Sequence, residues 1–261
     1  MKCLLVSDLH YTLKQLDWVD RVATDFDVVV MAGDHLDIAS AVALEAQIVV
    51  LLKYLQRVGS RARLLVSSGN HDLNARDASG EKVARWMSRV RQLGVAADGD
   101  AVEVADTLFS ICPWWDGPEA HKAVDAQLAR DAERRTRRWV WVYHAPPSDS
   151  PTSWAGARHF GDDALVAWIR RYRPAMVFTG HIHQSPFRQG GSWVDRIDDT
   201  WVFNPGRQIG PVPTHVIVDS DAGHAMWFSL AGNEIVPLGV PLSRPLAEIG
   251  PDADVHVGVG S

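Results

Sequence analysis

Cysteine is scarce in this chain, whose 261 residues include only Cys3 and Cys112. The two form no CxxC pair, so the sequence excludes a zinc site built from thiolates and argues against a disulfide framework. Each lies in an apolar run typical of a β-strand. We therefore expect two buried, reduced thiols in a cytoplasmic protein.

Long apolar runs are lacking as well. No stretch approaches the roughly 20 residues that a membrane-spanning helix needs. The strand-like run 2–6 is apolar after Lys2, but it is too short for the core of a signal peptide and leads directly to polar candidate site residues. The sequence thus predicts a soluble protein without a membrane partner.

An excess of basic residues is also absent. The formal net charge is −6, from 26 Lys and Arg against 32 Asp and Glu. Nucleic-acid polymers and anionic membranes favour basic surfaces, so neither is expected as the main partner, although a local basic groove remains compatible with this charge. Apolar residues make up 46% of the chain, enough for a sizeable core in one α/β domain.

Strand and helix signals alternate along the first two thirds of the chain. Short apolar runs typical of buried strands occur at 2–6, 27–32, 63–68, 107–112, 139–143 and 175–179. Helix-compatible stretches separate them at 13–24, 41–57, 80–92, 119–135 and 162–172. This alternation predicts βαβ units and a largely parallel sheet.

The pattern changes after residue 190. Strand-like runs at 200–203, 213–219 and 224–229 are separated by turns, and we interpret them as antiparallel strands added to a second sheet. Residues 238–261 are rich in Pro, Gly and Val and have no helical period. We therefore expect one domain over residues 1–237 and a surface tail over 238–261, either packed or frayed.

Candidate metal ligands and acid–base groups lie just past the carboxyl ends of five predicted strands. In open α/β sheets, ligands bind in the crevice outside these strand ends. The side chains are Asp8, His10, Asp34, Asn70, His71, Asp72, His144, His181 and His183.

The chemistry of these side chains is coherent. Carboxylate, amide and imidazole donors suit Mn, Fe, Zn or Co better than a metal that prefers thiolates. Gly33, Gly69 and Gly180 precede Asp34, Asn70 and His181, where glycine allows a bend or a close approach. A single histidine at a strand end is usually structural, but five motifs in order favour a shared site.

This series of motifs resembles that of the calcineurin-like metallophosphoesterases over about residues 1–220. The matching segments are Asp8-Leu9-His10, Gly33-Asp34, Gly69-Asn70-His71-Asp72, His144-Ala145-Pro146-Pro147, Gly180-His181-Ile182-His183 and Asn204-Pro205-Gly206-Arg207. The resemblance implies an α/β fold, a four-layer αββα sandwich with two mixed β-sheets.

The resemblance also implies an enzyme that hydrolyses phosphate esters with two divalent metal ions, Mn or else Fe, Zn or Co. Asp8, His10 and His183 would bind the first ion. Asn70, His144 and His181 would bind the second, and Asp34 would bridge the two. A hydroxide shared by the metals would attack phosphorus, His71 would protonate the leaving oxygen, and Asp72 would orient the His71 ring.

Substrate choice is expected to depend on two loops, residues 112–121 and 148–161. Trp114 and Trp115 either stack on a planar leaving group or pack in the core, and Arg158, His159 and Arg207 are candidates for substrate binding. We favour a small phosphodiester or nucleotide as substrate. The alternatives are a phosphomonoesterase, a nuclease or a non-catalytic protein-binding scaffold.

Two residues beside the motifs keep open interpretations. Asp37 either hydrogen-bonds a ligand histidine or caps the segment that follows it. His35 follows the bridging aspartate and points either into the site or away from it. The sequence does not indicate an oligomeric state.

Overall fold

Two mixed β-sheets form the centre of the molecule. The computed structural model describes residues 1–134 and 137–250. The eight-stranded sheet contains, in spatial order, β16 (Ala247–Glu248), β15 (Gly232–Pro237), β14 (His224–Ser229), β13 (His215–Asp219), β1 (Lys2–Val6), β2 (Val28–Ala32), β3 (Arg63–Ser67) and β6 (Ala96–Ala97). The six-stranded sheet contains β11 (Val194–Ile197), β12 (Thr200–Phe203), β10 (Met176–Phe178), β9 (Arg138–Val142), β8 (Thr107–Ile111) and β7 (Ala101–Val104).

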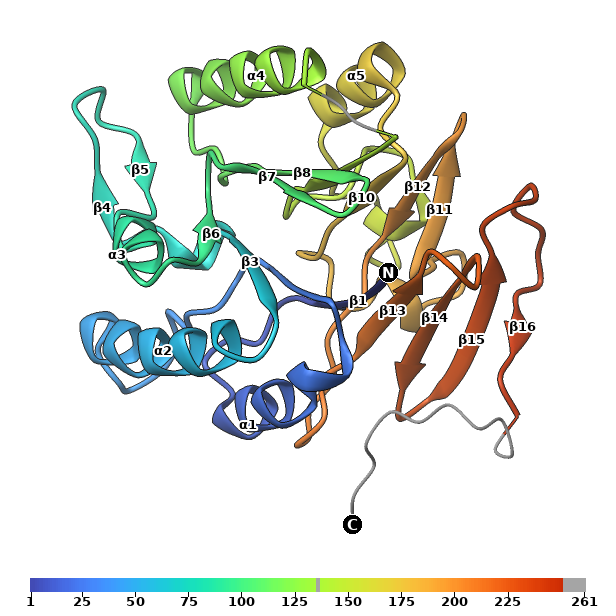
Figure 1. Cartoon of the computed structure of the whole chain (residues 1–261), viewed down its shortest axis with the longest axis horizontal. Coiled ribbons are helices and arrows are strands. Elements are labelled where there is room, and N and C mark those ends of the chain that lie inside the picture. Colours follow the sequence, from blue (N-terminus) through green and yellow to red (C-terminus); the bar gives the residue numbers. More distant parts are fainter. Residues whose placement is uncertain (135–136, 251–261) are drawn as a thin grey trace.

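Helices cover the outer face of each sheet (Figure 1). The eight-stranded sheet is covered by α1 (Leu13–Val22), α2 (Leu44–Gly59) and α3 (Met87–Gln92). The six-stranded sheet is covered by α4 (Pro118–Ala132) and α5 (Asp163–Tyr172). Smaller elements are the hairpin of β4 (Ala75–Arg76) and β5 (Lys82–Val83) and the 3-10 turns η1 (Ala23–Asp25), η2 (Asn70–Asp72), η3 (Pro151–Ser153) and η4 (Ser185–Phe187).

The central strands are apolar throughout because both of their faces are buried. In β1, Leu4 and Val6 pack toward α1 and α2, whereas Cys3 and Leu5 pack between the two sheets. Alternation of this kind follows from the two-residue period of a strand, and burial on both sides produces a continuous apolar run. The arrangement confirms the predicted α/β class and the αββα order of layers.

The strands after residue 190 do not join the sheets as expected. β12 lies in the six-stranded sheet and pairs in parallel with β10, while β13 pairs antiparallel with β1 and extends the first sheet. The antiparallel pairing expected for these runs is confirmed for β13 and β14, but they extend the first sheet, and β12 pairs in parallel with β10 as well as antiparallel with β11. The hydrophobic period of a strand sets which faces are buried, but it does not identify the neighbouring strand.

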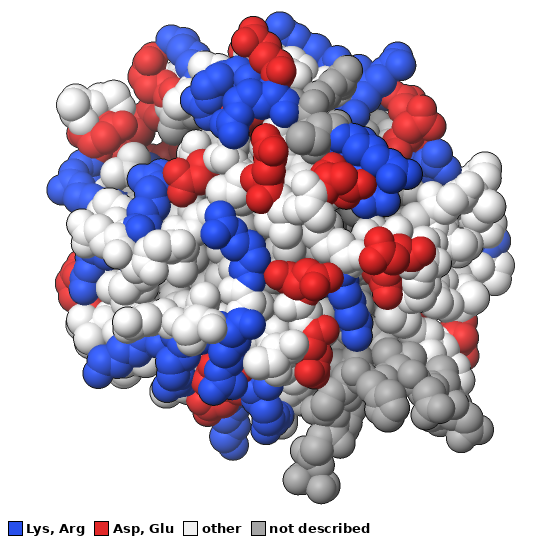
Figure 2. Space-filling model, viewed as in Figure 1, with Lys and Arg blue, Asp and Glu red and all other residues white. Residues whose placement is uncertain are grey.

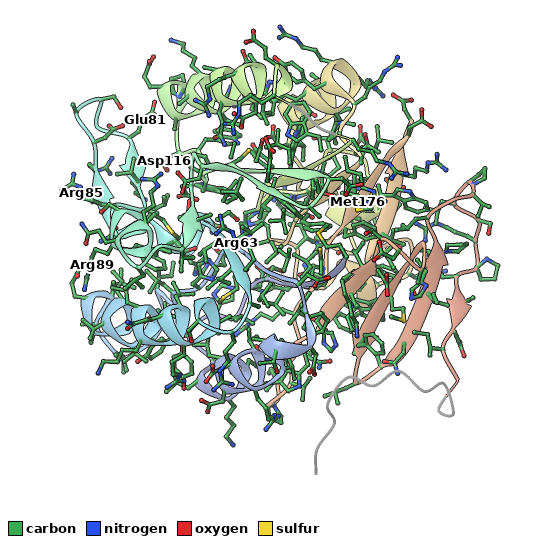
Figure 3. All side chains as sticks on the ribbon, viewed as in Figure 1. Arg63, Glu81, Arg85, Arg89, Asp116 and Met176 are labelled. Atoms are coloured by element: carbon green, nitrogen blue, oxygen red, sulfur yellow. The ribbon has the colours of Figure 1, made fainter. Side chains whose placement is uncertain are left out.

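One predicted helix begins later than expected. The stretch 80–92 becomes helical only at Met87, because its first residues form a hairpin that docks on α4. The Glu81 carboxylate accepts hydrogen bonds from the amides of Glu119 and Ala120, each at 2.8 Å, and Asp116 accepts one from the Lys82 amide at 2.9 Å (Figure 3). A tertiary cap at the start of α4 thus overrides local helix propensity.

The other four helices occur where they were predicted, with ends shifted by a few residues; residue 135, one expected end, lies outside the described residues. Of the segment 238–261, the described part is packed: Leu238, Leu242 and Leu246 contact the core between the sheets, and β16 pairs with β15. Residues 251–261 lie outside the described residues. Cys3 and Cys112 are buried and unpaired, as expected.

Across residues 1–134 and 137–250, no helix has both the length and the apolar character needed to cross a membrane.

The first prediction concerns Asp162, which caps α5 ahead of the strand that carries two candidate ligands. Its side chain accepts a hydrogen bond from the Ala164 amide at 2.8 Å and another from the Tyr143 hydroxyl. Asp162→Ala removes the cap and leaves a buried hydroxyl without its acceptor, so we expect unfolding free energy to fall by about 2–4 kcal/mol. Denaturant unfolding measures this, with exposed Asp163→Ala as the control; equal losses would contradict the capping role.

Candidate metal centre

Five loops meet at the carboxyl ends of β1, β2, β3, β9 and β10. The loops after β1 and β2 are bonded to each other, because the Asp8 amide donates to the Gly33 carbonyl at 3.1 Å and the His10 amide to the Asp34 carbonyl at 3.0 Å. In the other sheet, the Gly180 amide donates to the His144 carbonyl at 2.9 Å. The candidate side chains therefore come from both sheets and lie on a backbone frame of hydrogen bonds.

The backbone of this frame is strained at the ligands themselves. Asp8, His10, Asp34 and His181 have positive φ angles of 56°, 41°, 55° and 69°. Residues other than glycine seldom adopt this left-handed conformation, which costs of order 1–3 kcal/mol each and concentrates at functional sites. These strained conformations point the ligand side chains into the site, and they lower the stability of the folded chain.

Glycine precedes three of the ligands because no other residue fits there. A Cβ at Gly33 would lie 2.3 Å from His144 Nδ1, one at Gly69 would lie 2.2 Å from Asp34 Oδ1, and one at Gly180 would lie 2.5 Å from Asp8 Oδ2. Gly33 also has a φ of +83°. The predicted close approach holds at all three positions, and the predicted bend at Gly33.

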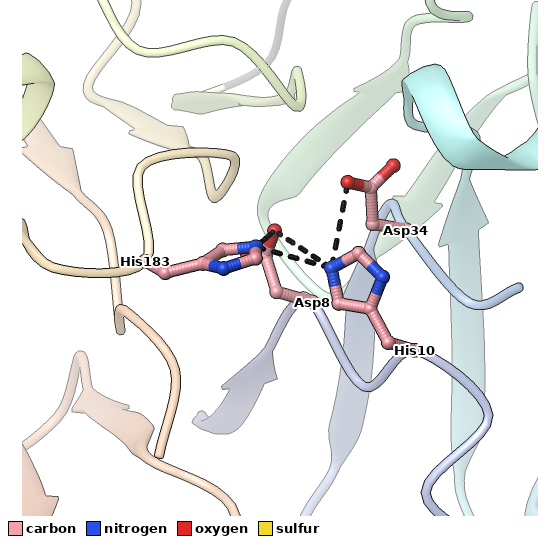
Figure 4. Close-up of side chains that lie close together, drawn as sticks. All are labelled: Asp8, His10, Asp34 and His183. Atoms are coloured by element: carbon pink, nitrogen blue, oxygen red, sulfur yellow. Dashed lines mark hydrogen bonds and ion pairs between the residues drawn. The ribbon is translucent and has the colours of Figure 1, made fainter. Parts of the chain in front are cut away.

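The first group of ligand atoms comes from Asp8, His10, Asp34 and His183, all within 4.8 Å of one another (Figure 4). His183 Nε2 lies 3.1 Å from Asp8 Oδ1 and 3.0 Å from His10 Nε2, and His10 Nε2 lies 3.7 Å from Asp34 Oδ2. Two imidazole nitrogens that approach each other beside two carboxylates form a donor set suited to a divalent cation.

The second group shares Asp34 with the first and adds His144 and His181. His144 Nε2 lies 3.3 Å from Asp34 Oδ2, and His181 Nδ1 lies 2.9 Å from the amide oxygen of Asn70. The structure therefore brings together all seven predicted ligands in two adjoining sets, with Asp34 common to both.

The orientation of His144 fits a metal ligand. Its Nδ1 lies 2.7 Å from the Ala32 carbonyl oxygen and donates to it, which leaves the lone pair on Nε2. Nε2 is buried and has no hydrogen-bond partner among the described residues. A carbonyl partner that fixes the ring and its tautomer in this way is characteristic of ligand histidines.

Buried negative charge dominates the electrostatics. Burial opposes ionisation of Asp34, yet the charges of His144 and His71 and the hydrogen bond from the His71 amide hold the pKa of Asp34 below its usual range. Burial would likewise lower the pKa of His144, but Asp34 and Asp8 outweigh it and raise that pKa to about 9. Either a proton on His144 or a divalent cation would place positive charge next to the two carboxylates and compensate their negative charge.

His10 and His181 show the opposite shift. Burial lowers the pKa of each to about 4, and at His181 the neighbouring charge of His144 contributes in the same direction. Both rings are therefore neutral near pH 7, which is the form that binds metals.

His71 lies at the open edge of the site. Its Nε2 is 4.0 Å from Asp34 Oδ2, its ring packs edge-on against that of His10, and its side chain is 26% exposed. Its amide donates to Asp34 Oδ1 at 2.9 Å, which fixes the backbone next to the shared carboxylate.

The predicted role of Asp72 is wrong. Its carboxylate accepts hydrogen bonds from the amides of His35 and Leu36, each at 3.0 Å, and from that of Gly69 at 2.8 Å. These three amides show that Asp72 joins the loops after β2 and β3. Asp72 does not orient the His71 ring, because the Nδ1 of that ring has no hydrogen-bond partner among the described residues.

Of the three candidate substrate-binding residues, Arg207 lies beside the ligands, whereas Arg158 and His159 do not. The Arg158 guanidinium lies 4.2 Å from the centre of the Phe160 ring, and the His159 ring packs against Trp154. Neither contacts a candidate ligand within the described part of the chain, so their role stays a prediction. Arg207 does reach the site, since its amide donates to the His183 carbonyl at 2.9 Å.

Both adjacent tryptophans pack against the core beside the six-stranded sheet, and one of them also contacts the ligands. Trp114 packs against His181 and His144, with ring centres 5.1 and 5.6 Å apart, and remains partly exposed. Trp115 donates from Nε1 to the Tyr143 hydroxyl and serves in packing. Of the two rings, only Trp114 adjoins the ligands.

The open interpretations of His35 and Asp37 are resolved. His35 points away from the site, where Nε2 donates to the Ser67 carbonyl at 2.8 Å. Asp37 caps a turn by accepting from the Ala39 amide at 2.9 Å, and α2 begins only at Leu44.

Asp98 and Ser68 also support the site, although their sequence pattern did not predict this. Asp98 Oδ1 accepts from the Ser68 amide at 2.7 Å, and Ser68 Oγ accepts from the Trp114 amide at 2.9 Å. These bonds join the loop that carries Asn70 to the tryptophan beside the ligands. Asp98 follows a short strand in an ordinary Asp-Gly turn, so nothing in the sequence distinguished it.

Comparison with known proteins agrees with this geometry. A family model described as calcineurin-like phosphoesterase matches residues 1–185. Among curated protein sequences none matches. The protein TT1561 of Thermus thermophilus superimposes with a TM-score of 0.57 and 14% identity, covering 91% of this chain and 98% of that chain.

A second solved structure is purple acid phosphatase PPD1 from yellow lupin (Lupinus luteus) seeds. It superimposes with a TM-score of 0.54 and 13% identity, covering 92% of this chain but 52% of the lupin chain. At such identities these structures establish a shared fold.

The second prediction separates steric fit from backbone strain. Gly33 and Gly80 have similar φ angles of +83° and +88°, but a Cβ at Gly80 would meet nothing within 4 Å. Both alanine variants should carry the same backbone strain, about 1–2 kcal/mol. Only Gly33→Ala should also displace His144, so we expect it alone to lose metal, as measured by elemental analysis. Equal metal content in the two variants would contradict the steric role.

Proposed function

The chain belongs to the calcineurin-like phosphoesterase family, and from this premise we propose that it hydrolyses a small phosphodiester or a nucleotide. Membership makes it a metal-dependent phosphoric ester hydrolase with a dinuclear centre, which confirms the resemblance read from the sequence. The observation that carries the proposal is the pair of ligand sets that share Asp34.

In this proposal, Asp8, His10 and His183 would hold one divalent ion, Asn70, His144 and His181 would hold the other, and Asp34 would serve both sets. Mn is the preferred metal, with Fe, Zn or Co as alternatives that the same donors accept. When bound, two such ions neutralise phosphoryl charge and lower the pKa of water.

The chain's own side chains account for the remaining steps. His71, at the open edge of the site, protonates the leaving oxygen, a contribution worth about 100- to 10,000-fold in rate. Trp114 excludes water from the His144 and His181 side of the centre and offers its partly exposed ring to a planar leaving group.

The surface supports a small substrate over a polymer. The net charge is −6, and on the face shown in Figure 2 basic and acidic side chains are interspersed. A polymer would require an extended basic surface, because phosphate neutralisation supplies most of its non-specific affinity. A cytoplasmic location belongs to the same proposal and is supported by two buried, unpaired cysteines.

The third prediction tests the activity. Mn-loaded protein should carry close to two ions per chain, gain thermal stability from Mn, and lose hydrolysis in a chelator. At matched ionic strength, bis-aryl phosphate and cyclic nucleotides should be cleaved faster than aryl phosphate and single-stranded DNA. Preference for the monoester would identify a phosphomonoesterase, and salt-sensitive preference for DNA a nuclease. Intact activity without metal would overturn the mechanism.

The fourth prediction concerns proton donation by His71. His71→Ala should keep metal content near that of the wild type and slow turnover of alkyl esters by about 100-fold or more. Activated aryl esters, whose leaving groups need little protonation, should suffer less. His224→Ala, at the start of β14, is the matched histidine control. Equal losses on both ester types would argue against a proton donor.

A further inference from the structure

Arg207 is held against the first group of ligands by the turn that follows β12. Its amide donates to the His183 carbonyl at 2.9 Å. The fully buried Asn204 fixes this turn, because its side chain donates to the Ile182 carbonyl at 3.2 Å and accepts from the Gly206 amide at 2.9 Å. The loop of His183 and the loop of Arg207 therefore form one rigid unit.

The guanidinium of Arg207 bonds to no acceptor within the described part of the chain. Its Nε is buried without a hydrogen-bond partner, and within residues 1–134 and 137–250 no carboxylate or carbonyl oxygen bonds to its terminal nitrogens. The backbone contact with His183 places Arg207 beside the first ligand group, and its charge is one of the causes that lower the pKa of the His10 ring. A buried N–H without an acceptor costs about 1–3 kcal/mol, and in the half-buried Arg207 this applies to Nε.

Arg196 shows how a comparable arginine is satisfied elsewhere in the same chain. Its Nε is also buried without a partner, but its terminal nitrogens donate to the Val240 carbonyl at 3.1 Å and to Asp199 at 3.2 Å. Arg207 and Arg196 therefore share a buried Nε, and they differ in that only the terminal nitrogens of Arg196 bond to acceptors among the described residues.

We propose that Arg207 donates hydrogen bonds to a phosphoryl oxygen of the substrate, and of the phosphomonoester that cleavage of a diester leaves, with inorganic phosphate as the probe for this contact. This inference rests on the proposed function and names the residue that recognises the phosphoryl group in the same site. A planar guanidinium matches two oxygens of a phosphate, a geometry that an ammonium group lacks. The rigid turn orients the Arg207 side chain in the free protein. Less conformational entropy is therefore lost when the ester binds.

The test measures binding of inorganic phosphate by calorimetry to the Mn-loaded full chain. In Arg207→Met and Arg207→Gln, we expect the dissociation constant for phosphate to rise by about 10- to 100-fold, because hydrogen bonds to a charged group are lost. Arg207→Lys should recover part of the affinity. Arg196→Met removes the same charge elsewhere and should leave phosphate binding unchanged.

Two further readouts distinguish binding from structural support. Metal content should stay at the wild-type level in all Arg207 variants, and without phosphate their unfolding temperatures should equal or exceed that of the wild type, since no acceptor is lost. The rise in unfolding temperature on adding phosphate should shrink in the neutral variants.

The proposal is overturned if both neutral variants bind phosphate within about twofold of the wild type, or if both lose metal or fail to fold. Arg207 would in the latter case support the His183 loop. Arg207-dependent phosphate binding without hydrolysis of any ester would reject the proposed function and keep this inference. Ester hydrolysis by a protein whose affinity for phosphate does not depend on Arg207 would keep the proposed function and reject this inference.

Discussion

Two ionised carboxylates are buried at the junction of the sheets. The arrangement of the loops at the carboxyl ends of the strands, here called the rim, depends on this constraint. Asp8 and Asp34 are almost fully buried, and charge in such a place must be paired or coordinated to be tolerated. Amides of the neighbouring loops supply donors to both, from His181 to Asp8 and from His71 to Asp34. Imidazoles from both sheets then surround the same oxygens.

This constraint explains why so much of the rim is fixed by backbone contacts. Left-handed residues turn the ligands inward, and glycines leave room where the loops touch. Asp72 joins the loop after β2 to the loop after β3, and Asn204 joins the His183 loop to the Arg207 turn. Strain of this kind persists only where the surroundings over-determine the conformation. The site is rigid because each loop is held by its neighbours.

The sequence could predict the parts of this arrangement that depend on local order. A ligand directly after a buried strand must lie at the carboxyl edge of the sheet, so Asp8, Asp34 and His144 could be placed without coordinates. Partners across the chain could not be read in this way. Nothing in the period of β13 identifies β1 as its neighbour, and nothing in the segment around Glu81 shows that its carboxylate caps α4. Asp72 looked like a partner of the adjacent His71, yet three amides from other loops occupy it.

The unequal burial of the ligands has a consequence for how the centre fills and empties. The side chain of His183 is 35% exposed, whereas that of His144 is fully buried. A cation bound by His183 would lie beside a side chain that solvent reaches, whereas one bound by His144 would lie beside a buried ring that packs against Trp114. The two positions should therefore exchange their ions at different rates, with the His183 position turning over first. A protein transferred from metal-rich to metal-poor surroundings would pass through a state with one ion bound. The two metals found in the centre would then depend on the order in which the metals were supplied as well as on their affinities.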